Sequence, residues 1–165
     1  MNSFEQKSVA RHRPPPILAL KTKLSGLVSG TDIVTADGLI PVQHLSEGDR
    51  IITRDAGMQR LAWIEALYVT TGAVRIEPSA LGHSKPEETL TMPEGQRLLV
   101  RDWRAKALYG ANVVGVRVAR LVDGGFVRSL GPRTLQLYRL GFQRQHTIYG
   151  GGLELMAHTT RFAIP

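Results

Sequence analysis

GTDIVTADGLIPVQHLSEGDRIITRD, residues 30–55, holds two turn signals and two apolar runs in one short unit. Asp37-Gly38 predicts a tight two-residue hairpin, because both residues tolerate positive φ at the central positions. Leu45–Asp49 predicts a second reversal, and the β-prone run Arg50–Arg54 stops at Asp55-Ala56-Gly57. The order of these signals indicates consecutive antiparallel strands.

Composition extends this prediction to the whole chain. The 165 residues are 42% hydrophobic, which is enough for one buried core and little for two. Seventeen glycines and frequent turn signals favour an all-β fold. We expect at most one or two short helices, one over Asp102–Tyr109 with an Asp cap and one further turn over Leu153–His158. Asp123-Gly124-Gly125 predicts a hairpin turn, and Gly150-Gly151-Gly152 a bend after the last strand.

The first 25 residues differ from the rest. They are basic, contain Pro14-Pro15-Pro16 and have few strand formers, so we predict an extended arm over 1–25 and a β domain over 26–165. We expect a soluble, cytoplasmic protein, since no leader or membrane-spanning apolar stretch is evident. There is no cysteine and the histidines show no close pairing, so we expect neither a metal nor a cofactor.

The turn order resembles the amino-terminal block of the Hint family, the module shared by inteins and Hedgehog autoprocessing domains, in its bacterial branch. The matching features are Gly30-Thr31, Asp37-Gly38, Pro41-Val42, Leu45 and Gly48-Asp49. The likeness continues through the segments 90–100, 113–124 and 140–153, and covers roughly residues 26–160. The resemblance implies a horseshoe of short antiparallel strands.

The resemblance also implies a chemistry that this chain lacks at the matching positions. Hint proteins cleave their own backbone with a Cys or Ser at the first residue of the module, and that position is Gly26 here. The family supplies a proton from a histidine, and the aligned residue is Gln96, which cannot titrate near neutral pH. The only asparagines are Asn2 and Asn112, so the terminal asparagine of splicing inteins has no counterpart. We therefore expect a Hint-like domain with vestigial catalytic positions, which acts as a binding or scaffold domain.

Two residues are candidates for a remaining self-cleavage activity. Ser25 lies one residue before the expected nucleophile, and its hydroxyl is a candidate for an N-to-O acyl shift that would cleave the chain. His146 lies one residue after a histidine often found in the family's late strand, and is either a relocated catalytic group or a strand histidine with a backbone or solvent partner.

Charge distribution supports a second function class. Residues 97–165 carry eleven basic against three acidic side chains, while residues 26–96 carry five against ten. This predicts a basic face that binds nucleic acid or another polyanion, an unidentified protein partner or a second copy of the chain. The residues of this predicted face are Arg97, Arg101, Arg104, Lys106, Arg117 and Arg120.

Overall fold

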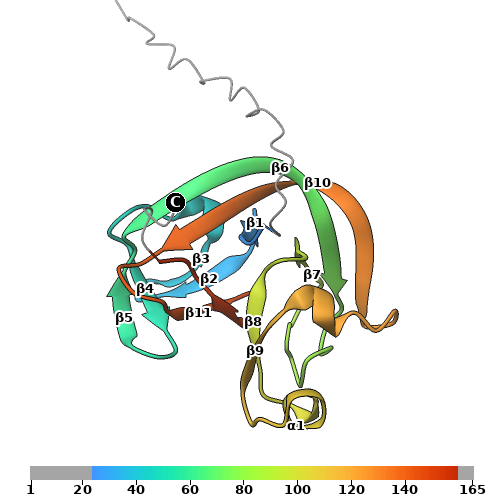
Figure 1. Cartoon of the computed structure of the whole chain (residues 1–165). Coiled ribbons are helices and arrows are strands. Elements are labelled where there is room, and N and C mark those ends of the chain that lie inside the picture. The colour runs from blue at the N-terminus through green and yellow to red at the C-terminus, as the bar shows by residue number, and fades with distance from the viewer. Residues whose placement is uncertain (1–23, 160–165) are drawn as a thin grey trace, which may run out of the picture.

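The computed structural model describes residues 24–159. Within this range it contains twelve β-strands, one α-helix and two short 3-10 helices, in agreement with the all-β prediction (Figure 1). The predicted arm falls outside the described residues except for Leu24 and Ser25.

The strands form two antiparallel sheets. The smaller sheet has the order β1-β10-β6-β7. Its strands are β1 (Leu27–Val28), β6 (Trp63–Ile76), β7 (Leu90–Pro93) and β10 (Val127–Gly141). The larger sheet has the order β3-β2-β4-β11-β12-β8-β9, with β5 paired to β4. Its strands are β2 (Asp32–Thr35), β3 (Gly38–Pro41), β4 (Arg50–Thr53), β5 (Gly57–Arg60), β8 (Arg97–Val100), β9 (Val114–Arg117), β11 (Thr147–Gly150) and β12 (Leu153–Met156).

The long strands β6 and β10 pair along nearly their whole length and arch over the larger sheet (Figure 1). Their register is interrupted between Ser129 and Gly131, where Gly131 has a φ of 68°. A bulge of this kind bends the strand that carries it and increases the local twist. The other end of the pair places Trp63 opposite Gly141.

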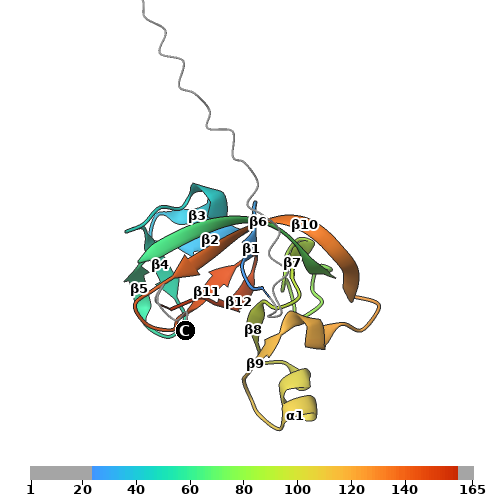
Figure 2. The same ribbon diagram turned by 45° about the horizontal axis from the view of Figure 1, so that its top comes forward.

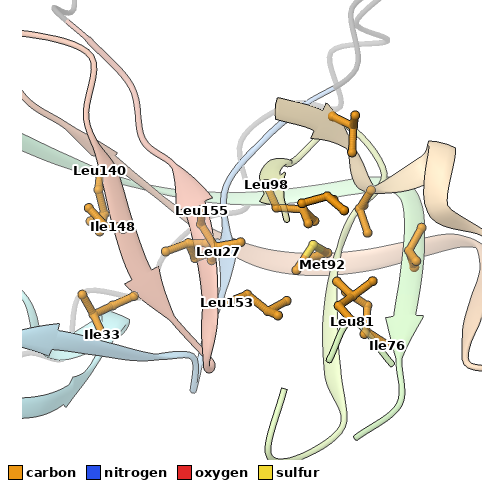
Figure 3. Close-up of a cluster of buried hydrophobic side chains, with 14 of the residues drawn as sticks. Leu27, Ile33, Ile76, Leu81, Met92, Leu98, Leu140, Ile148, Leu153 and Leu155 are labelled. Atoms are coloured by element: carbon orange, nitrogen blue, oxygen red, sulfur yellow. The ribbon is translucent and has the colours of Figure 1, made fainter. Parts of the chain in front are cut away.

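The core lies between the two sheets. Figure 3 shows Leu27 of β1 and Met92 of β7 in the same buried cluster as Leu98, Ile148 and Leu155 of the larger sheet. All five side chains are buried. Because strands from both sheets meet here, this packing fixes the position of the residues around β1, which begins next to Gly26.

The predicted hairpin after Ile33 is confirmed, with a different turn. Thr35 pairs with Gly38, so Ala36 and Asp37 are the central residues and Gly38, with a φ of 97°, follows them. The Thr35 hydroxyl donates to the Gly38 carbonyl at 2.7 Å. The glycine is therefore used just after the turn and not within it.

A short helix appears where the sequence predicts it. α1 spans Trp103–Tyr109, with the Asp102 side chain accepting a hydrogen bond from the Arg104 amide at its start. Gly110, with a φ of 67°, ends it. Figure 2 shows α1 at the lower end of the molecule, beyond β8 and β9.

Three local predictions are wrong. Leu153–His158 is not helical, because Leu153–Met156 forms β12 and pairs with β11 and β8. The bend at Gly150–Gly152 is the turn of the β11–β12 hairpin, where Gly151 and Gly152 both have positive φ. Asp123-Gly124-Gly125 joins no hairpin, since β9 pairs with β8 and β10 pairs with β6.

The remaining regular segments are short. Val42–His44 and Val118–Leu121 form 3-10 helices η1 and η2. No helix among residues 24–159 is long and apolar enough to cross a membrane.

Candidate functional site

The start of β1 brings together Gly26 and Gln96, the two positions that the family resemblance singles out. The Gly26 amide donates a buried hydrogen bond to Oε1 of Gln96 at 2.9 Å. Gln96 lies between β7 and β8 and is 2% exposed. Its Nε2 donates to the carbonyl oxygens of Arg97 and Met156 at 2.8 and 3.1 Å. These three bonds fix the orientation of the amide group and hold the Ser25–Gly26 peptide link against it.

The backbone at Gly26 strongly favours glycine. Its φ is +155°, which L side chains rarely adopt, and a Cβ there would lie 3.3 Å from both Leu137 Cβ and the Tyr138 carbonyl oxygen. A side chain at this position would therefore meet both backbone strain and crowding.

This geometry predicts that Gly26→Ser fails to restore cleavage of the Ser25–Gly26 bond. The variant is expected to lose about 1–3 kcal/mol of unfolding free energy through backbone strain and crowding. Urea denaturation and intact-mass measurement check both parts. Gly125→Ser is the matched control, because Gly125 has no positive φ and the nearest atom to a new Cβ is Asp123 Oδ1 at 3.7 Å. A Gly26→Ser protein as stable as wild type would contradict the prediction.

A hydroxyl and an imidazole meet one residue upstream. Ser25 Oγ lies 3.0 Å from Nε2 of His158. His158 follows β12, and its backbone amide and carbonyl bond to Leu140 and Phe142 at the end of β10. This residue could not be found from the sequence, because the contact spans 133 positions and depends on the backbone hydrogen bonds between His158 and the end of β10.

Burial, with a smaller effect from the positive charge of Arg139, lowers the pKa of His158 to about 4. The imidazole is therefore neutral near pH 7 and has a lone pair that can accept a proton from a hydroxyl. The ring also lies beside Trp63, with centroids 6.1 Å apart. Ser25 and His158 thus have the geometry of a nucleophile and its base.

Ser25 and His158 line a cleft of about 370 Å³. Its other lining residues are Gly95, Arg97, Arg117, Gln145, Met156 and Ala157.

His146, the histidine that the sequence analysis singled out, has other partners. Its Nδ1 lies 2.8 Å from Oδ2 of Asp55, and its ring packs edge-on against Phe142. Burial alone raises the pKa of Asp55, but the hydrogen bonds from the Thr147 amide and His146 outweigh this effect, and the pKa lies below its ordinary value. His146 lines a different cavity, between β5 and the segment after β10. His146 therefore has the carboxylate of Asp55 as its side-chain partner, and not the backbone or solvent partner that the sequence predicts.

The six residues of the predicted basic face have two kinds of environment. Arg101 pairs with Glu154 at 2.8 Å, and Arg104 pairs with Asp102. No ion pair within the described part of the chain includes the other four residues, namely Arg97, Lys106, Arg117 and Arg120. Among residues 24–159, no three His, Asp or Glu side chains are grouped to hold a metal ion.

Comparison with known proteins places the chain in a family. Residues 25–157 match the Hint domain family, so the chain belongs to it. The fold is also similar to a bacterial intein-like domain from Clostridium thermocellum, with 16% identity over 82% of this chain and 99% of the other and a TM-score of 0.56.

Two inteins share the fold. A DnaB intein from Synechocystis sp. PCC 6803 is 12% identical over 81% of this chain and 99% of its own, with a TM-score of 0.55. A variant of the Ssp DnaB mini-intein is 11% identical over 86% and 99%, with a TM-score of 0.59. No curated protein matches the sequence.

Proposed function

We propose that this protein is a Hint domain that no longer cleaves the bond at the start of its module and works as a binding or scaffold domain. The observation that carries the proposal is the hydrogen bond from the Gly26 amide to Oε1 of Gln96. This amide nitrogen would be the leaving group of the family's reaction, and it faces a group that has no titratable proton.

The nucleophile is missing from the same place. Cleavage of the Ser25–Gly26 link by the family's route needs a side-chain oxygen or sulfur on residue 26, and glycine has neither. General acid catalysis typically contributes about 10²–10⁴-fold, and without a nucleophile the covalent route does not exist. The cleft beside Ser25 offers such a domain a surface for a binding partner.

The contact between Ser25 and His158 favours a second candidate, residual self-cleavage one bond earlier. In this reaction Ser25 Oγ attacks the carbonyl carbon of Leu24, and Nε2 of His158 takes the hydroxyl proton. The Leu24–Ser25 amide bond breaks, and His158 returns the proton to the released amine of Ser25. Water then hydrolyses the Leu24 ester. Gln96 has no part in this route, because its bond is to the amide of Gly26.

Intact-mass measurement of the purified chain, after long incubation with and without hydroxylamine or a strong thiol, tests both candidates. An unchanged mass under all conditions is the expected result. A fragment that begins at Gly26 would overturn the proposal, and one that begins at Ser25 would replace it with the second candidate. Ser25→Ala is the control for that outcome, since it removes the only hydroxyl that contacts His158 within residues 24–159.

A further inference from the structure

We infer that the cleft beside Ser25 binds an anionic group, a phosphate or a carboxylate, between Arg97 and Arg117. This inference rests on the proposed binding function and names the chemistry of the ligand. Both arginines are exposed, and both line the cleft.

The two arginines are direct cross-strand neighbours. Arg97 of β8 pairs with Arg117 of β9 in the antiparallel register. Side chains at such positions start about 5 Å apart, and like charges directly opposite each other are destabilising. An anion between the two guanidinium groups offsets this repulsion. Guanidinium groups suit that role because they form bidentate hydrogen bonds to carboxylates and phosphates.

No carboxylate of the described chain fills that role. The ion pairs among residues 24–159 include neither arginine, and no acidic residue lines the cleft. Glu94, the nearest acidic residue to Arg97 in sequence, has its carboxylate against Gly72 of β6. The positive charge of these two arginines is therefore uncompensated within this part of the protein.

Other residues that line the cleft supply neutral polar groups. Ser25 Oγ contacts His158, and Nε2 of Gln145 donates to the Ala157 carbonyl at 2.6 Å. The Ser25 hydroxyl donates to an anion when Nε2 of His158 carries the imidazole proton, because the serine oxygen then accepts from the histidine. The cleft has a volume of about 370 Å³, which leaves room for an anionic group carried on a larger molecule.

The test uses the full chain and two probes, inorganic phosphate and succinate, each titrated at constant ionic strength. The side-chain Nε–H signals of Arg97 and Arg117 in ¹H–¹⁵N NMR spectra report binding directly. We expect saturable shifts with at least one probe, and the comparison of the two distinguishes phosphate from carboxylate. A Trp103→Phe background leaves Trp63, next to His158, as the single tryptophan and gives an independent fluorescence signal.

The double variant Arg97→Gln/Arg117→Gln is expected to bind the probe about ten- to a hundredfold more weakly. Arg120→Gln/Arg133→Gln is the matched control, because it removes the same charge from exposed positions that do not line the cleft. Equal weakening in the control, or no saturable shift with either probe, would overturn the inference. If the titrations show no binding but the intact mass stays unchanged, the anion site is excluded and the proposal that the domain does not cleave itself stands. If the intact mass shows cleavage, that proposal is wrong whatever the titrations show.

Discussion

Gly141→Ala is expected to destabilise the protein by at least about 3 kcal/mol. A methyl group at this position would overlap the indole ring of Trp63, which lies directly across the β6–β10 pair. The ring cannot easily move, since it is 8% exposed and its Nε1 donates to the Thr159 carbonyl at 2.9 Å. The strands must separate or the tryptophan must leave its site.

Urea denaturation of the wild type and the variant measures this loss. Gly125→Ala is the control, because a Cβ there meets only the Asp123 carboxylate at 3.7 Å. A double-mutant cycle identifies the cause. In a Trp63→Leu background the Gly141→Ala penalty should shrink to about 1 kcal/mol or less, since the overlapping ring is absent. A penalty that stays the same in both backgrounds would show that the overlap is not its source.

The sequence was informative where structure is set by neighbouring residues. The hairpin after Ile33 and helix α1 depend on turn and cap chemistry within a few positions, and both were predicted. The residues at the centre of the hairpin turn differ from the prediction, because Gly38 follows the turn and does not lie within it. Strand β5 (Gly57–Arg60) was missed, since GMQR contains no β-branched or aromatic residue and gains its strand conformation from pairing with β4.

Long-range pairing explains the wrong predictions. The predicted helical turn over Leu153–His158 is wrong, because β11 and β8 lie on either side of Leu153–Met156 and make it a strand. Asp123–Gly125 has the residues of a hairpin turn, but β10 reaches back to β6, more than fifty positions earlier. Tertiary context of this kind overrides local propensity.

In the candidate site, too, some residues could be identified from the sequence and others depend on long-range contacts. The correspondence of Gly26 and Gln96 followed from the family resemblance, and the two residues are hydrogen-bonded. His158 could not be found by spacing, because its contact with Ser25 joins opposite ends of the chain. His146 is a candidate only because it lies one residue after a histidine often found in the family's late strand, and its carboxylate partner Asp55 lies 91 positions away.

Stability is expected to fall as the pH decreases from about 6.5 to about 4, with His158 as a principal cause. The pKa of this imidazole is about 4 in the folded protein and 6.5 in the unfolded chain, so the unfolded state binds the proton first. The stability that depends on the neutral imidazole is fully present above pH 6.5 and is lost as the pH falls through 4. The difference corresponds to about 3 kcal/mol at most.

His158→Gln removes the titrating group and keeps a side chain that can hydrogen-bond to Ser25. Its unfolding free energy, measured with urea at several pH values between 7 and 4, should decline by about 2 kcal/mol less than that of the wild type. His83→Gln, at an exposed position, is the control and should keep the wild-type slope. The lowered pKa of Asp55 acts mainly below its unfolded value of 3.8, so it contributes little within this window.

An NMR titration of the His158 ring connects this behaviour to the site. A midpoint near pH 4 would confirm that burial keeps the imidazole neutral under ordinary conditions, as a base for Ser25 requires. Because the bound anion would lie in the same cleft, saturating phosphate or succinate should raise that midpoint, since a negative charge stabilises the imidazolium. A midpoint near 6.5 without a probe would contradict the pH prediction and would mean that the charge of Arg139 and burial have little effect on this ring.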